Sequence, residues 1–403
     1  MAIATLLDPP NALFFDIDGF SRPDDGFSRP GACSNARPVG EMRDRRAVEE
    51  VAVCVPARNE ARRLPAFLEA MEASVEQARA AGVGVRLVVA LDGCTDASEA
   101  LLARARVTFP CPIVITRLPA LGISHAGRAR RAAMETGLSQ LADRVAETCE
   151  AEVGSALLTT DADTQVDADW IAASARALAA SDVVAGYVEW DDETPVPELA
   201  RQERYFDALH RWRRRIDPVA FDAPNPHHKQ YGASLAIRNE AYSRLGGLPE
   251  RRASEDVELC RRARLAGMRV RQDRNVRVTT STRRTGRARG GFSDAILSVE
   301  GTRGRPLHVD CPDAWTALYR ASATLRAAFE MGRPDARDLE DLGTELSDDE
   351  LKQAWAVSPS ADAYVTRLLD PVPGACGPRT PEVPKVPLEV AIARLETMTG
   401  ERI

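Results

Sequence analysis

The sequence predicts an α/β fold with a mostly parallel sheet flanked by helices. Between residues 51 and 188, short apolar runs rich in β-branched side chains alternate with stretches that carry apolar residues at helical spacing. Strands and helices that alternate in this way are typical of a parallel sheet with helices on both faces. The apolar run over residues 156–160 is followed by two carboxylates, Asp161 and Asp163. Because ligands of open α/β sheets bind outside the carboxyl ends of the strands, we expect these acids where a ligand would bind.

The individual strands and helices follow from the same patterns. Strands are expected over residues 51–55, 86–91, 112–116, 156–160 and 182–188, and helices after residue 59, over 168–180 and over 195–222. The last of these helices is rich in arginine and aromatic residues, and we expect most of its charge to face solvent.

Composition divides the chain into three parts. Residues 1–48 are rich in Pro, Gly, Asp and Arg, which predicts a flexible or irregular N-terminal arm. Residues 49–300 contain the alternating strands and helices and are expected to form the sheet domain. Residues 301–403 contain helix-like segments and a Pro-rich linker, which predict a helical extension packed on that domain.

Charge and motif content exclude several classes of function. A net charge of −7 argues against a nucleic-acid-binding protein. No apolar stretch is long enough to span a membrane and no signal peptide is evident, so we expect a cytoplasmic protein without integral membrane contact. The eight cysteines are scattered without the spacing of a zinc site. The glycine-rich loops of dinucleotide oxidoreductases and P-loop enzymes are absent from the sequence.

Acidic residues follow two of the expected strands. Asp96 and Glu99 have the spacing of a capping box, so Asp96 is expected to be structural. Asp92 is not part of a capping pattern and is available for a ligand. Asp161 and Asp163 are separated by one residue, so the first can bind a sugar or ribose hydroxyl while the second reaches a divalent cation held by phosphates. The alternative for this second loop is a turn in which aspartate caps the next helix.

Five short motifs occur in order along the sheet domain. They cover residues 55–60, 92–96, 127–130, 161–163 and 255–256. Together they resemble the motifs of glycosyltransferase family 2, whose members have the Rossmann-like GT-A fold, and the resemblance covers residues 51–292. It implies an enzyme that moves a sugar from a nucleotide-diphosphate sugar, with UDP or GDP, to an acceptor hydroxyl. It also implies an inverting mechanism that depends on a divalent metal ion.

The resemblance also implies roles for single residues. Nucleotide-sugar binding would fall to Pro56, Ala57, Arg58, Glu60, Asp92, Arg128, Arg130 and Asp161. Asp163, together with Asp161, would hold Mg²⁺ or Mn²⁺. Asp256 would act as the catalytic base, and its neighbour Glu255 would position the reacting groups. The alternative for this pair is a helix start capped by Ser254, where the helix dipole favours acids.

The second half of the chain is expected to supply the acceptor side. His227, His228, Gly232 and Ser234 are the candidate acceptor-side residues, and Arg283, Arg284 and Arg287 belong to a basic, glycine-punctuated loop that predicts a lid. Contact of the two histidines with an acceptor carboxylate or phosphate is favoured over metal binding, because adjacent side chains point apart. Some relatives carry a metal-binding histidine after the Glu-Asp helix, where this chain has Thr and Ser. The C-terminal extension is expected to contribute to acceptor choice or to a homo-oligomer.

Two other functions remain open at this point. A nucleotidyltransferase shares the strand-borne acid, but it needs a glycine-rich basic loop after the first strand, which the sequence lacks. A non-catalytic nucleotide-sugar-binding or scaffold protein would keep the pocket without turnover.

Overall fold

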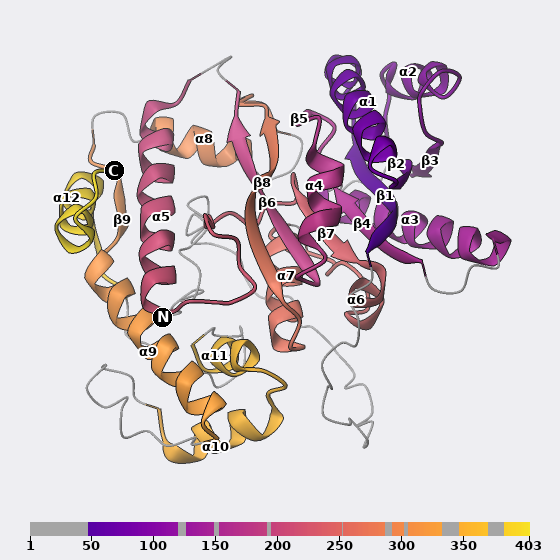
Figure 1. The fold of residues 1–403 in the computed structure, drawn as a ribbon. Coiled ribbons are helices and arrows are strands. Elements are labelled where there is room, and N and C mark those ends of the chain that lie inside the picture. Colours follow the sequence, from indigo (N-terminus) through magenta and orange to yellow (C-terminus); the bar gives the residue numbers. More distant parts are fainter. Residues whose placement is uncertain are drawn as a thin grey trace.

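The computed structural model describes residues 47–119, 126–148, 153–191, 195–251, 253–286, 292–301, 305–332, 346–369 and 383–403, with side chains omitted over 144–148 (Figure 1). The N-terminal arm expected over residues 1–48 lies outside this range except for its last two residues.

An eight-stranded sheet forms the centre of the fold, with strand order β3-β2-β1-β4-β7-β6-β8-β5. The strands are β1 (Val48–Ala57), β2 (Gly84–Asp92), β3 (Ile113–Leu118), β4 (Gly154–Thr159), β5 (Thr164–Val166), β6 (Val183–Trp190), β7 (Leu235–Arg238) and β8 (Val270–Thr280). Pairing is parallel from β3 through β2 and β1 to β4, and between β6 and β8. Only β7 and β5 run the other way. The expected α/β fold with a mostly parallel sheet is therefore confirmed.

Helices cover both faces of the sheet. One face packs against α1 (Leu64–Ala80), α2 (Ser98–Ala105) and α4 (Trp170–Ala177). The other face packs against α3 (Ala126–Thr148), α6 (Asn239–Arg244) and α7 (Glu255–Leu265). Strand β1 shows why both faces are apolar: Val53 and Val55 belong to the first core, whereas Ala52 and Cys54 belong to the second. A strand buried on both faces is a continuous apolar run, which is the pattern seen in the sequence.

A second group of helices stands beside the sheet, as Figure 1 shows. It contains α5 (Pro197–Ile216), α8 (Phe292–Gly301), α9 (Pro312–Glu330), α10 (Asp348–Val357), α11 (Ala361–Leu369) and α12 (Leu388–Thr399), with a small hairpin of β9 (His308–Asp310) and β10 (Lys385–Pro387). Aromatic residues of α5 and α9, including Tyr205 and Trp315, form the centre of its core with α12. The expected C-terminal helical appendage is therefore present, and the division of the chain at residues 48 and 300 stays a prediction.

Helix α5 differs from expectation in its length and in the burial of its charge. It ends at Ile216, and Asp217, which precedes a proline, is not helical. The expectation that most of its charge faces solvent is wrong for one face, where Glu203, Asp207 and Arg213 are buried. Sequence periodicity could not show this, because α5 packs between the sheet and α9 and the partners of these charges lie far along the chain.

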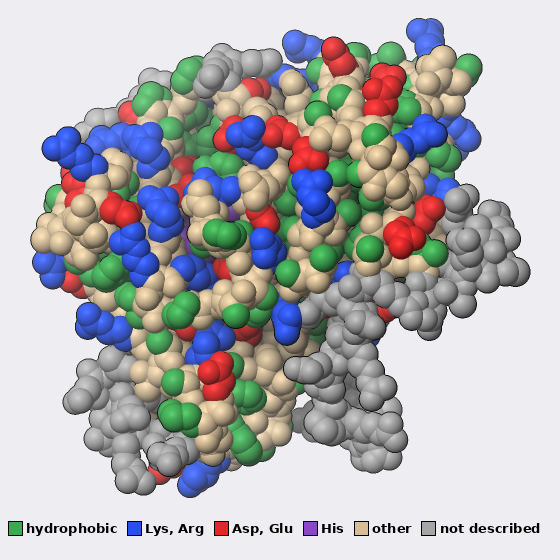
Figure 2. Space-filling view, viewed as in Figure 1, with side chains coloured by type: hydrophobic (Ala, Val, Ile, Leu, Met, Phe, Trp, Pro, Cys, Tyr) green, Lys and Arg blue, Asp and Glu red, His purple; other side chains and the backbone are tan. Residues whose placement is uncertain are grey.

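The surface carries charges of both signs. Figure 2 shows Lys and Arg side chains interspersed with Asp and Glu over the face that it draws, without a large area of one sign. Within the described part of the chain, no helix combines the length and apolar character that crossing a membrane requires.

Candidate functional site

The strands that run together end at one edge of the sheet. Since β1, β2, β4, β6 and β8 share a direction, the loops that follow them meet at this carboxyl edge. The loops after β1 and β2 are bonded to each other: the Asn59 side chain accepts from Thr95 N at 2.8 Å, and Glu60 N donates to Ser98 Oγ at 2.9 Å. Asn59 has a φ of 53°, a left-handed conformation that asparagine tolerates better than most residues. The first predicted binding loop is therefore held in one geometry by the second.

Asp96 is structural, but not in the way expected. The predicted capping box is wrong, because α2 begins at Ser98 and Glu99 pairs instead with Arg117 at 2.8 Å. Asp96 accepts from Ser98 N at 3.0 Å and from Ala61 N at 2.9 Å. It thus joins the two loops rather than closing a capping box.

Asp92 lies at the end of β2 and is 3% exposed. Arg128, at the start of α3, donates from Nη1 to Asp92 Oδ1 at 2.9 Å and to the carbonyl oxygen of Pro119 at 3.3 Å. The structure thus brings together two residues that were predicted separately to bind the nucleotide. Pro56 and Ala57 are the last two residues of β1, which pairs with β2, and the partly exposed Arg58 follows them.

Arg130 joins two of the predicted motifs. Its buried guanidinium donates from Nη2 to Asp161 Oδ1 at 2.6 Å and from Nη1 to Glu255. Burial opposes its charge, but Asp161 and Glu255 raise the pKa of Arg130 above its ordinary value. A Cβ at Gly232 would lie 2.4 Å from this guanidinium, so the glycine allows the close approach. Asp161 keeps 34% of its side chain exposed and remains accessible to a ligand.

Arg283 joins the segment after β8 to the loops after β1 and β4. Its Nη1 lies 2.9 Å from both carboxylate oxygens of Glu60, and its Nη2 lies 2.9 Å from Asp163 Oδ2. Burial, reinforced by the charges of Asp161 and Glu60 and opposed by Arg283, raises the pKa of Asp163 to about 6. Two acids predicted to bind ligands therefore share one arginine of the predicted lid.

The rest of the predicted lid is only partly described. Arg284 pairs with Glu300 of α8 at 3.1 Å, and Arg287 lies outside the described residues. Thr282 donates from its main-chain N at 3.0 Å to Asp191, which lies just after β6. This contact was not predicted, since the sequence around Asp191, which follows the fifth expected strand, does not indicate that Asp191 pairs with Thr282.

Asp256 begins α7 together with Glu255, and the two carboxylates face different partners. Asp256 accepts from Gly232 N at 2.6 Å and from its neighbour Val257 N at 2.8 Å. Burial and the adjacent charge of Glu255 raise the pKa of Asp256 to about 7, against the opposing effect of Arg130. Ser254 occupies the N-cap position with a φ of 63°, and its side chain makes no capping hydrogen bond. The alternative of an ordinary serine-capped helix start does not describe this site.

Three of the four predicted acceptor-side residues lie inside the protein. His227, His228 and Ser234 each have 0% exposure. The Oγ of Ser234 accepts from Trp170 Nε1 at 3.0 Å, and His228 Nδ1 lies 2.8 Å from Asp207 Oδ1. In this conformation only Gly232 of the four lies beside the site acids, and the acceptor role of the others stays a prediction.

His228 belongs to a buried ionic cluster that the sequence analysis missed. We define this α5 cluster as Glu203, Asp207, His228, Lys229 and Arg274. Lys229 Nζ lies 2.9 Å from Glu203 Oε2 and 4.4 Å from the centre of the Tyr187 ring. Arg274 Nη2 lies 2.6 Å from Asp207 Oδ2. The only hint in the sequence was Lys229 itself, one of few lysines in a chain dominated by arginine.

Metal binding can be judged from the available oxygen atoms. Within the described ranges, no group of three or more His, Cys, Asp or Glu side chains is arranged to hold a metal ion. A cation held partly by substrate phosphates needs only one or two carboxylates, and Asp163 with the accessible Asp161 meets that requirement. The residues present therefore fit a divalent ion that binds together with a diphosphate.

Comparison with known proteins adds little to this geometry. No protein-family model matches the chain, and no curated protein does so either. Among solved structures, the mannosyltransferase PcManGT from Pyrobaculum calidifontis in complex with GDP-Man and Mn²⁺ is 18% identical, with 80% of this chain and 86% of that chain covered and a TM-score of 0.42. Residues 1–349 of S. aureus TarS in complex with UDP are 14% identical, with 79% and 89% covered and a TM-score of 0.40. Because this likeness is low, the function has to be argued from the chain's own residues.

Proposed function

We propose that the protein is a glycosyltransferase that moves a sugar from a UDP- or GDP-sugar to an acceptor hydroxyl. The observation that carries the proposal is the meeting of Asp92, Asp161, Asp163 and Asp256 with Arg128, Arg130 and Arg283 at the carboxyl edge of the sheet. Acids alone would suit many ligands. Acids interleaved with arginines suit a ligand that has both hydroxyl groups and phosphates.

The nucleotide would occupy the side of the site formed by β1 and β2. Asp92 would accept a hydrogen bond from the ring N–H of uracil or guanine, and Glu60 would contact the ribose or the base. Arg128 and Arg283 would then neutralise phosphate oxygens, since guanidinium groups bind such oxygens in pairs. The pairs that Arg128 and Arg283 make with these acids hold the carboxylates in place before the ligand arrives.

The diphosphate would lie beside Asp163 and Asp161, the two acids that would hold Mg²⁺ or Mn²⁺. A divalent ion bound there would supply positive charge to the leaving diphosphate. Arg130 and Arg283 lie beside these acids and would stabilise the same developing charge.

Asp256 is the group best suited to take the proton of the acceptor hydroxyl. Its pKa of about 7 allows it to accept a proton near neutral pH, and the amides of Gly232 and Val257 hold its carboxylate in place. Glu255 is bonded to Arg130 and would position that arginine. In an inverting reaction Asp256 would lie on the face of the donor sugar opposite the leaving diphosphate.

The competing functions predict different products. The protein would be incubated with UDP- and GDP-sugars and Mn²⁺, and the release of free nucleoside diphosphate would be followed. A glycosyltransferase releases it slowly by hydrolysis and faster with an acceptor, whose mass then increases by one sugar. A non-catalytic binding protein leaves the donor intact, and a nucleotidyltransferase releases pyrophosphate from a nucleoside triphosphate. Either of these results would exclude the proposed transfer.

A further inference from the structure

Arg283 connects the acid proposed to contact the nucleotide with the acid proposed to hold the metal ion. Its Nη1 donates to both carboxylate oxygens of Glu60 at 2.9 Å, and its Nη2 lies 2.9 Å from Asp163 Oδ2. The side chain of Arg283 is 21% exposed, whereas those of Glu60 and Asp163 are 7% and 12% exposed. In this conformation the two carboxylates are largely closed to solvent, and the arginine is the most exposed of the three.

The main chain around Arg283 is held in place on both sides. Thr282 donates from its main-chain N to Asp191 at 3.0 Å, and Arg284 pairs with Glu300 of α8 at 3.1 Å. Because both neighbours are bonded to other elements, Arg283 can change partners by rotation of its long side chain alone. No movement of the main chain is needed.

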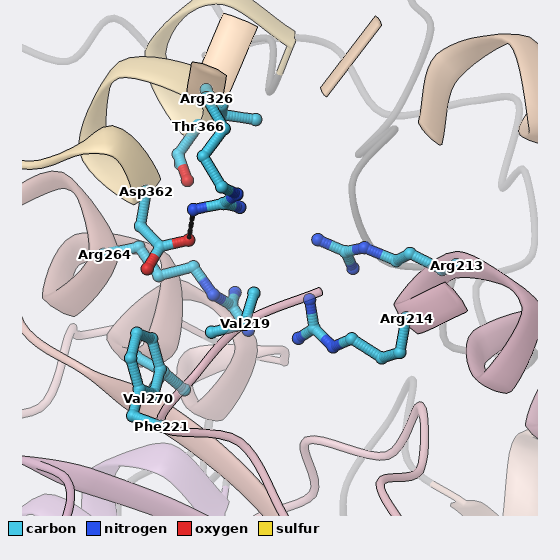
Figure 3. A pocket seen from close by; sticks show the side chains of 10 residues that line it. Arg213, Arg214, Val219, Phe221, Arg264, Val270, Arg326, Asp362 and Thr366 are labelled. Atoms are coloured by element: carbon cyan, nitrogen blue, oxygen red, sulfur yellow. Dashed lines mark hydrogen bonds and ion pairs between the residues drawn. The ribbon is translucent and has the colours of Figure 1, made fainter. Parts of the chain in front are cut away.

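A second arginine bridges two acids in the same way, but in an enclosed place. Arg326 of α9 lies 2.7 Å from Asp217 and 2.8 Å from Asp362. Figure 3 shows Arg326 and Asp362 at a pocket whose volume, about 10 Å³, is room for one water molecule. A phosphate cannot enter there, so we expect Arg326 to stabilise the fold only. Arg283 differs because it contacts the loop that carries Asp161, whose side chain is 34% exposed.

The charges around Arg283 oppose a divalent ion that arrives alone. Asp161 already accepts from Arg130 at 2.6 Å, and Glu60 and Asp163 share Arg283. An ion at Asp163 would add two positive charges close to the charge of Arg283, and like charges at short distance repel each other. The arginine therefore competes with the ion for the same carboxylate.

A diphosphate removes this competition. Guanidinium groups bind phosphate oxygens in pairs, as they bind carboxylate oxygens, so Arg283 can turn from Asp163 to the phosphates. It then leaves the carboxylate to an ion that the diphosphate also holds. We propose that Arg283 makes binding of the divalent ion at Asp163 conditional on the diphosphate. This inference rests on the proposed function, because it concerns the same site.

The test measures Mn²⁺ binding with and without UDP or GDP. Free Mn²⁺ would be followed by electron paramagnetic resonance, and a titration without protein would correct for Mn²⁺ bound by the nucleotide in solution. In the unaltered protein the nucleotide should tighten Mn²⁺ binding by about 5- to 150-fold, the usual range for coupled sites. Arg283→Gln should bind Mn²⁺ without nucleotide about tenfold more tightly, within the same range, so that the effect of the nucleotide becomes smaller.

Two further variants separate the charge of Arg283 from its structural contacts. Arg283→Lys keeps the positive charge and should bind Mn²⁺ without nucleotide as weakly as the unaltered protein. Arg277→Gln removes an arginine of β8 that is 49% exposed and pairs with Asp167, so it should leave Mn²⁺ binding unchanged. Arg283→Met is a second neutral replacement if Arg283→Gln does not fold.

The outcomes distinguish this inference from the proposed function. If the unaltered protein binds Mn²⁺ together with UDP or GDP, but the neutral variants bind the ion alone no more tightly, only the inference is overturned. The same holds if these variants lose thermal stability without a change in Mn²⁺ affinity, which is the result of a merely structural role. Mn²⁺ binding that does not depend on the nucleotide, or no Mn²⁺ binding at all, would contradict the proposed function together with the inference.

Discussion

The carboxyl-edge site and the α5 cluster are both built from paired acids and bases, yet they differ in access to solvent. At the edge, Arg283 is 21% exposed and bridges Glu60 and Asp163, and Asp161 is 34% exposed. In the α5 cluster, His228 has 0% exposure and Glu203 about 6%. Asp161 is open to a ligand at the edge, whereas His228, Lys229 and Glu203 of the cluster are closed to solvent. We therefore expect edge pairs to act in binding and cluster pairs to act in stability.

The largest effect is expected for Asp256→Asn. The amide keeps the shape of the side chain but cannot accept a proton, and general-base catalysis typically contributes about 10² to 10⁴-fold. Transfer should fall by that factor with donor affinity nearly unchanged, as measured by steady-state kinetics and calorimetry.

A matched control is Glu258→Gln, two residues further along α7, where the carboxylate pairs with Arg262 at 2.9 Å. It should leave the rate nearly unchanged. If Asp256→Asn stays active while Glu255→Gln is inactive, the roles of the two acids are reversed.

The next effect concerns the α5 cluster. Lys229→Ala leaves the carboxylate of Glu203 buried without its ammonium partner, and breaking a buried pair in this way costs about 3–5 kcal/mol of stability. Denaturant unfolding followed by circular dichroism would measure the loss. The exposed Lys352 offers a control, since Lys352→Ala should change stability by less than about 0.5 kcal/mol. Equal stability of the two variants would show that the cluster is not structural.

A smaller effect is expected for Asp92→Ala. Loss of a hydrogen bond to a charged acceptor should weaken binding of UDP or GDP by about 1–3 kcal/mol, measured by calorimetry. Asp167→Ala is the control, because Asp167 pairs with the exposed Arg277 at 2.8 Å outside the nucleotide loops. Unchanged affinity in Asp92→Ala would remove this residue from the site.

The smallest effect is the dependence of transfer on pH. The raised pKa of Asp256, about 7, means that its proton-accepting form is lost as the pH falls through that value. The rate should therefore drop about fivefold between pH 7 and pH 6 and level off above pH 8, as expected for a single titrating base. Residual activity of Asp256→Asn should lack this step, and the same step in that variant would point to another group.

Much of the sheet could be predicted because the pattern that indicates each strand is contained in a few neighbouring residues. Residues 51–57 of strand β1 form a continuous apolar run, and similar runs precede the acid that ends β2 and the acids that come after β4. Parallel strands place their carboxyl ends together, so Asp92, Asp161 and Asp163 could be expected at one edge before any contact was known.

The pairing of charges was not predictable because it is set by distant residues. Glu203 and Lys229 are 26 positions apart, and Arg283 lies 223 positions from Glu60. No periodicity in α5 distinguishes a charge that faces solvent from one that meets a lysine of a later loop. His227 and His228 show the same limit, since two polar rings after a helix gave no sign that the fold would bury them.

The central claim is that the carboxyl edge binds a nucleoside diphosphate together with a divalent ion. Titration calorimetry of UDP and GDP would be carried out with Mn²⁺ and with EDTA, on the unaltered protein and on Asp163→Ala. We expect one of the two nucleotides to bind more tightly with Mn²⁺, and Asp163→Ala to lose this difference while remaining folded. Binding of neither nucleotide under any condition, or equal binding with Mn²⁺ and EDTA, would contradict the claim.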